Sequence, residues 1–319
     1  RSEASVKEHP AMTFGSVYTL PHVFAIASCP LLQKTRQSST QRQGQESTCK
    51  GAHHRTPVFA MSGVSCFLPY SGKQRLNLYE TRYLRMHQDV ASRQKNRDVV
   101  AVYQSNAGDI APVGVIIELL HWTEVEPMPR ISAVFETGSR VKIHQVTNAG
   151  EAGSDANYQV ADVELLDDSP GVNAHDEVRA AWCNVWIILG QLVELQARLK
   201  ERPALAPAAL KLGRKSGVLS AVDVWRPIGF IQELHVRQAR AIHSKYVKLI
   251  AQAVQEDAPV LELEEAYKAE LDRVKLALER FPALLLLPSM VNILAEASEI
   301  ALDEVHRLET LLAESTRAI

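Results

Sequence analysis

The stretch that decides the fold lies between residues 76 and 86 and reads Leu76-Asn77-Leu78-Tyr79-Glu80-Thr81-Arg82-Tyr83-Leu84-Arg85-Met86. Leu76, Leu78 and the ring of Tyr79 predict a strand, because side chains two residues apart lie on one face of a strand. Tyr83 and Met86 continue an apolar face at helical spacing. The stretch therefore predicts a strand that runs directly into a short helix.

Glu80 and Arg82 lie where this strand ends and the helix begins. A carboxylate at that place can accept hydrogen bonds from the backbone N–H groups of the first helical turn. The arginine can donate to a neighbouring carbonyl. We interpret both residues as structural rather than as a binding site.

Short segments of β type fill residues 56–168 around this stretch. They are rich in Val, Ile and aromatic residues and occupy residues 58–61, 64–68, 76–79, 99–103, 113–120, 131–136, 140–146 and 158–166. Glycine and asparagine separate them, and residues 82–93 supply the one helix. Many short strands at this spacing predict a β-sheet or barrel rather than alternating strands and helices.

The order of these segments resembles the Lon N-terminal domain, the substrate-recognition part of Lon-type proteases. The family pattern begins near L-x-L-[FY]-E-x-R-Y and continues with a strand, V-G-x-x-x-E-[IL], G-x-x-R-[FV]-x-[IV] and Y-x-x-A-x-V-E. This chain follows it at residues 76–83, 99–103, 113–119, 138–143 and 158–164. The signature positions are Leu78, Tyr79, Glu80, Arg82, Tyr83, Gly114, Gly138 and Arg140. The chain departs from the pattern at Thr81, where Pro or Ala is usual, and in a weak first strand.

The resemblance implies an α+β fold in which residues 56–169 form a PUA-like, partly open β-barrel of the Lon N-terminal type. It also implies that the barrel binds polypeptide through apolar surface. We name Trp122, Met128 and Phe135 as candidate protein-binding residues. Trp122 lies in a polar, proline-bounded segment where an aromatic side chain is not obviously part of a core.

Residues 170–319 change to helical periodicity and predict a helical bundle. Apolar residues recur three and four apart over residues 175–201, 228–255 and 259–282, and again after Pro288. Trp182 and Trp186 lie one turn apart and are expected in the core of the bundle. No motif of the Lon resemblance extends into this half.

Residues 1–55 contain seven Lys or Arg and three acidic residues and are rich in Ser, Thr and Gln. Such a segment is typical of disordered chain and of organelle transit peptides. We expect import into an organelle, a plastid rather than a mitochondrion, with a secretory route and a cytoplasmic location as alternatives.

The composition excludes several classes of function. Four scattered cysteines without a C-x-x-C pair argue against a zinc module and a disulfide framework, and no apolar run reaches the roughly 18 residues of a membrane span. Without residues 1–55 the chain has 28 basic and 34 acidic residues, a net charge of −6. That sign disfavours RNA binding, which the PUA-like fold would otherwise suggest.

No catalytic motif can be assigned. The segment Gly213-Arg214-Lys215-Ser216-Gly217 lacks the preceding strand and the spacing of a phosphate-binding loop. His235 and His243 share a helix face without a carboxylate at ligand spacing, so core or surface roles are favoured over metal binding. We expect no enzyme activity, no cofactor and no metal.

The sequence thus predicts a non-catalytic protein that binds unfolded polypeptide or a partner protein, as an adaptor in organellar protein quality control. A structural subunit that docks into a larger complex through its helices is the alternative. An RNA-binding PUA-like protein and an enzyme of unrecognised type are weaker hypotheses. The oligomeric state is open.

Overall fold

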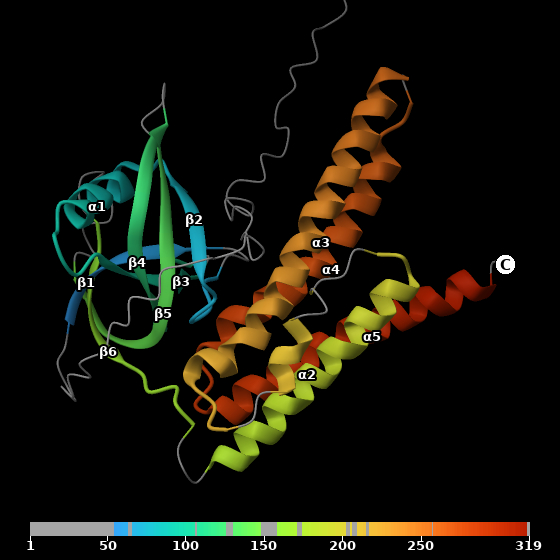
Figure 1. Ribbon diagram of the computed structural model, residues 1–319. Coiled ribbons are helices and arrows are strands. Elements are labelled where there is room, and N and C mark those ends of the chain that lie inside the picture. Colours follow the sequence, from blue (N-terminus) through green and yellow to red (C-terminus); the bar gives the residue numbers. More distant parts are fainter. Residues whose placement is uncertain are drawn as a thin grey trace, which may run out of the picture.

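The structure is a computed structural model of the 319-residue chain. It describes residues 54–317 except 63–65, 106, 126–129, 148–157, 171–173, 202–204, 206–208, 215–216 and 257. The predicted transit-like segment therefore lies almost wholly outside the described residues. Figure 1 shows a β-rich half joined to a half made of long helices.

The β-rich half contains one mixed sheet and a short helix. Its elements are β1 (His54–Met61), β2 (Lys73–Leu78), α1 (Thr81–Ala91), β3 (Asp98–Gln104), β4 (Ile110–Val125), β5 (Arg130–Thr147) and β6 (Val160–Leu165). The strand order is β2-β5-β4-β3-β1-β6, and β5 also pairs with β6. The edge of β5 that faces away from β4 pairs with β2 over its first part and with β6 over its last part. The β5–β6 pairing closes β1, β3, β4, β5 and β6 into a barrel. In this sheet β2 pairs with β5 alone. The predicted α+β class with a partly open barrel is confirmed.

The opening stretch has the predicted structure. β2 ends at Leu78 and α1 begins at Thr81. Leu76, Leu78, Tyr83 and Met86 are all buried and belong to one apolar cluster, so the strand and the helix share a core.

Two of the expected strands are in fact one. β5 continues without a break through Gly138, where the sequence predicts a turn between residues 136 and 140. Gly138 lies where the register with β4 shifts, between the pairs Thr137–Ile117 and Arg140–Val115, so that the strand bends here rather than reversing. The segment that the sequence predicts as a strand at residues 64–68 is not a strand at its described residues 66–68. These residues pack their side chains against the helices instead.

The helical half contains α2 (His175–Arg198), a 3₁₀ turn η2 (Ala209–Arg214), α3 (Ala221–Gln255), α4 (Leu261–Leu284) and α5 (Met290–Arg317). α2 lies along α5, and α3 lies along α4 as a long hairpin (Figure 1). α3 begins seven residues before the predicted start at residue 228. The cause is a capping box, in which Ser220 Oγ accepts from the Asp223 backbone N–H and the Asp223 carboxylate accepts from the Ser220 N–H.

The tryptophan pair of α2 lies in the core of the helical half, as predicted. Trp182 and Trp186 are buried, with ring centroids 6.0 Å apart, and Trp182 Nε1 donates to the Asp223 carbonyl at 2.8 Å. Of the described helices, α2 is the one whose length and apolar composition would suit a membrane span. The core helix of a folded domain can be equally long and apolar, and α2 packs along α5 as such a core helix does.

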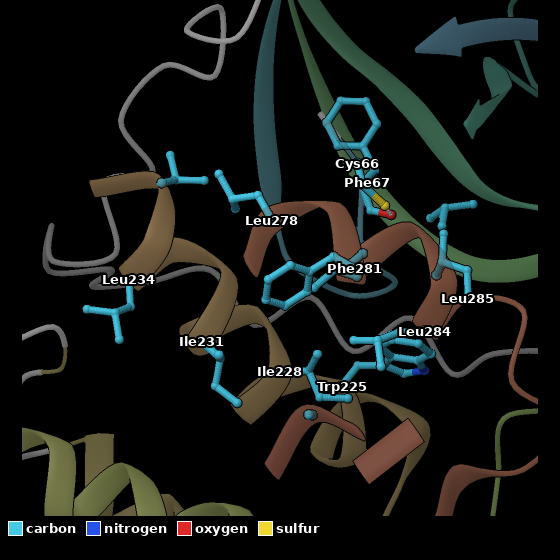
Figure 2. Close-up of a cluster of buried hydrophobic side chains, with 14 of the residues drawn as sticks. Cys66, Phe67, Trp225, Ile228, Ile231, Leu234, Leu278, Phe281, Leu284 and Leu285 are labelled. Carbon is cyan, nitrogen blue, oxygen red and sulfur yellow. Dashed lines mark hydrogen bonds between the residues drawn. The ribbon is translucent and has the colours of Figure 1, made fainter. Parts of the chain in front are cut away.

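An apolar interface joins the two halves. Cys66 and Phe67, between β1 and β2, lie among side chains of α3 and α4 that include Ile231 and Phe281 (Figure 2). Gln232 Nε2 of α3 donates to the Cys66 carbonyl at 2.8 Å. Because the cluster is continuous from the barrel to the helices, the halves share one core.

Candidate functional site

Trp122 lies near the end of the long β4–β5 ribbon. A β-bulge between Leu119 and His121 shifts the register of β4, so that Trp122 pairs with Ala133. A bulge inserts one residue and turns the following side chains to the other face of the sheet. Trp122 therefore lies on the same face as α1, yet 37% of its surface remains exposed.

Two side chains hold the Trp122 ring in place. The ring of His87, on α1, packs edge-on against it with centroids 5.0 Å apart. The guanidinium carbon of Arg97 lies 5.7 Å from the centroid of the indole. A ring fixed by two neighbours loses little conformational entropy when a ligand packs on its exposed part. Trp122 is thus a preorganised apolar surface.

His87 is buried, and neither of its ring nitrogens has a hydrogen-bond partner among the described residues. Burial lowers the pKa of the imidazole, against a smaller opposing effect of the nearby Glu124 carboxylate. The imidazole is therefore neutral near pH 7 and acts as an aromatic support for Trp122. Arg97 and Glu124 place one charge of each sign beside the ring.

The other two candidate binding residues do not join Trp122. Phe135 is only 2% exposed and belongs to the main core cluster, so its assignment as a binding residue is wrong. It lies on β5 directly opposite Leu119 and faces the same core as Ala133. Met128 lies outside the described residues.

Glu80 and Arg82 are structural, but not in the predicted way. Glu80 is the N-cap residue of α1, yet its side chain makes no capping hydrogen bond. Its carboxylate accepts instead from Arg82 Nε at 2.8 Å. Arg82 lies over the Tyr83 ring at 4.6 Å, and the Tyr83 hydroxyl donates to the Ala60 carbonyl of β1 at 2.9 Å. The junction is thus fixed by a chain of contacts that ends on the barrel.

Tyr79 was predicted only as a signature position of the fold, yet its aromatic side chain is exposed. Its neighbour Leu78 is buried, whereas Tyr79 is 47% exposed. The alternation of a strand carries the signal, because consecutive side chains point to opposite faces. Val125, the last residue of β4, is also exposed.

The two signature glycines have different roles. A Cβ atom on Gly114 would lie 2.7 Å from Val100 Cγ1 and 2.8 Å from the Ala101 carbonyl oxygen. β3 and β4 can therefore pack at this distance only with glycine at 114. A Cβ on Gly138 would meet its nearest atom, the Ile116 carbonyl oxygen, at 3.5 Å, an ordinary contact.

Arg140, the last signature residue, binds the β-rich half to the helices. Its Nε and Nη2 donate to Asp168 Oδ1 at 2.9 and 2.7 Å, and its Nη1 donates to the carbonyls of Leu285 and Leu287 at 2.9 and 3.2 Å. Trp225 Nε1 completes the site by donating to Asp168 Oδ2 at 2.8 Å. The C-terminal end of α4 offers unpaired carbonyls, which suit a cation.

The far end of the α3–α4 hairpin exposes apolar side chains that were not among the predicted binding residues. Val247 and Val254 lie seven residues apart on α3, and Leu261 begins α4; all three are largely exposed. The signal in the sequence is a second apolar stripe on α3 beside the one that packs on α4.

The described residues contain no group of three or more His, Cys, Asp or Glu side chains arranged to hold a metal ion. His235 is buried in the helical half, where its Nδ1 contacts Gln238 Oε1 at 3.2 Å. His243 Nδ1 lies 3.1 Å from the Tyr267 hydroxyl. The two histidines thus have separate partners.

Neither a protein-family model nor a curated protein sequence matches the chain. Solved structures do. The N-terminal domain of the Mycobacterium avium complex Lon protease is 17% identical, with a TM-score of 0.36, and the match covers 56% of this chain and 97% of that one. A Lon N-terminal domain protein from Xanthomonas campestris is 15% identical, with a TM-score of 0.30, and the match covers 51% of this chain and 90% of that one.

Both are Lon N-terminal domains. This is the family that the motifs of the β-rich half resemble.

Proposed function

We propose that the chain is a non-catalytic polypeptide-binding module whose β-rich half holds exposed apolar segments of other proteins on Trp122. The observation that carries the proposal is the Trp122 ring, which is partly exposed near the end of the β4–β5 ribbon and supported by His87 and Arg97. The resemblance of the sequence motifs to the substrate-recognition domain of Lon proteases points to the same function.

The chemistry of the site suits an unfolded polypeptide. An indole offers a large apolar surface, and burial of such a ring contributes about 1–3 kcal/mol. Arg97 beside the ring and Glu124 nearby can form hydrogen bonds to backbone or side-chain groups of either polarity. Such a site has broad rather than narrow selectivity, as recognition of unfolded chains requires.

The test measures binding of a fluorescently labelled unfolded protein, reduced and carboxymethylated ribonuclease A, by fluorescence anisotropy. Trp122→Ala is expected to weaken binding about tenfold, which corresponds to about 1.4 kcal/mol. Leu165→Ala is the matched control, because Leu165 is an exposed apolar residue of β6 with 62% of its surface accessible. Equal binding by the wild type and Trp122→Ala would refute the role of Trp122, and no binding by the wild type would refute the function.

A second candidate function is supported by the apolar end of the α3–α4 hairpin. Val247, Val254 and Leu261 would suit a structural subunit that docks into a larger assembly through its helices. The double variant Val247→Ser/Val254→Ser would then lose partners that co-purify with the wild type, whereas Trp122→Ala would keep them. The reverse pattern would favour polypeptide recognition.

We place this activity in an organelle, with the plastid first, where the chain would serve protein quality control as an adaptor. The support is the composition of residues 1–55, which is basic, rich in hydroxyl side chains and poor in acids. A fusion of these residues to a fluorescent protein is expected to enter the organelle. A fusion that stays in the cytosol would contradict the assignment.

A further inference from the structure

β2 is the strand of the described sheet with a neighbour on one side only. The Thr137 N–H donates to the Gly72 carbonyl at 3.1 Å. This bond determines which residues of β2 direct their backbone N–H and C=O groups toward β5. Backbone groups alternate in direction along an antiparallel strand. Residues 74, 76 and 78 therefore bond to β5, and the N–H and C=O groups of Lys73, Arg75 and Asn77 point away from it.

We infer that this outer edge of β2 binds an extended segment of the same polypeptide that packs on Trp122, and that the segment adds a strand to the sheet. The inference rests on the proposed function and names how the bound chain is held. The two sites lie in one row across the sheet, because Leu76 of β2 pairs with Ala133 of β5, which pairs with Trp122 of β4.

The edge itself specifies a polypeptide strand as its occupant. Its donors and acceptors recur every second residue, about 6.8 Å apart, which is the repeat of an extended backbone. Strand addition of this kind draws affinity from main-chain hydrogen bonds and therefore tolerates many sequences. That property fits an unfolded substrate better than a folded partner.

Charge narrows the occupant further. Lys73 and Arg75 are exposed on the outer face of the sheet, where Lys73 lies opposite Glu136 of β5 and Arg75 lies opposite the apolar Val134. A bound strand places every second side chain beside them on that face, so acidic residues are favoured there. Two copies of the chain that joined β2 to β2 would instead oppose four cations, which disfavours self-association through this edge.

Amide hydrogen exchange, measured by NMR on the full chain with and without saturating reduced, carboxymethylated ribonuclease A, tests the inference. The amides of Lys73, Arg75 and Asn77 are expected to exchange freely without the probe and at least about tenfold more slowly with it. The amides of Leu76 and Leu78 are the internal control, since they already bond to β5. The inference is overturned if the three outer amides stay unprotected while the probe binds, or if they are protected before it is added.

A pair of variants tests the same edge by affinity. Arg75→Pro removes one outward N–H and leaves the bonds to β5 intact, because proline is tolerated where a strand donates to no neighbour. It is expected to weaken probe binding about tenfold, and Arg75→Gln, which keeps the N–H, by less. Unchanged binding by Arg75→Pro together with weak binding by Trp122→Ala would reject the edge and keep the proposed function. Absence of binding by the wild type would reject both.

Discussion

Arg140 Nη2 lies 2.7 Å from Asp168 Oδ1, and both side chains are almost completely buried where the sheet meets the helices. Two charges out of water are stable only when their remaining donors and acceptors are satisfied. Here the carbonyls of Leu285 and Leu287 bind the guanidinium, and Trp225 binds the carboxylate. These contacts therefore hold four distant parts of the chain together, at residues 140, 168, 225 and 285–287.

Replacement of Arg140 by Met should destabilise the fold by about 3–5 kcal/mol, because it leaves the buried Asp168 carboxylate without its cation. Trp225→Phe should cost less, about 1–2 kcal/mol, since it removes one hydrogen bond to the same carboxylate. Urea unfolding gives both values. Arg280→Met is the control: Arg280 pairs with Glu296 and Asp303 near the surface, and its loss should cost under about 1 kcal/mol.

The Cys66 thiol should report on whether the two halves separate. It is buried at their interface, and burial raises its pKa to about 12, so thiolate is scarce at neutral pH. In a background with Cys29, Cys49 and Cys183 changed to Ser, we expect Cys66 to react very slowly with a thiol reagent, and faster when Arg140→Met is added. A Cys66 that reacts as fast in the native protein as in denaturant would contradict the buried interface.

Gly114→Ala should destabilise the barrel by about 1–3 kcal/mol, because the new methyl group would overlap Val100 and the Ala101 carbonyl. Gly138→Ala is the matched control in the neighbouring strand, where the same methyl group finds ordinary contacts and the change should be small. Thermal unfolding of the two variants compares them. Equal losses would show that the close approach of β3 and β4 at Gly114 is not the cause.

Acid should weaken the helical half through His235. Burial lowers the pKa of this imidazole below its usual 6.5, outweighing the Glu304 carboxylate, which acts in the opposite direction. The unfolded chain then binds the proton more readily than the folded one, so stability is full above about pH 6.5 and falls as the pH falls. Between pH 7 and pH 5.5 the wild type should therefore lose stability through this group.

The difference between the wild type and His235→Gln isolates that contribution from those of other groups. Urea unfolding across the pH range should show a steeper decline for the wild type. Parallel declines would mean that His235 titrates alike in the folded and unfolded states.

The β-rich half could be predicted from the sequence because its signals are local. Alternation places Leu76 and Leu78 inward, helical spacing places Tyr83 and Met86 on the same core, and the order of the motifs gives the fold. Gly138 misled the prediction, because glycine inside a long bent strand has the same local signature as glycine in a turn.

The candidate site was only partly predictable, because its geometry depends on distant pairs. The bulge that turns Trp122 toward α1 arises from the register between β4 and β5, which neither strand encodes alone. Phe135 looked similar in sequence, yet its register opposite Leu119 turns it into the core. Of the buried partners of Arg140, Asp168 lies 28 residues farther along the chain and Trp225 lies another 57 residues beyond Asp168, so no motif could join them.

The central claim is that an unfolded polypeptide packs on Trp122, and tryptophan fluorescence tests it most directly. Trp182, Trp186 and Trp225 are buried, so Trp122 is the exposed tryptophan of the chain's four. Reduced and carboxymethylated ribonuclease A contains no tryptophan. On its addition the wild type should show a saturable blue shift of its emission that Trp122→Phe lacks, because only Trp122 loses water. Binding without that difference between the two proteins would contradict the claim.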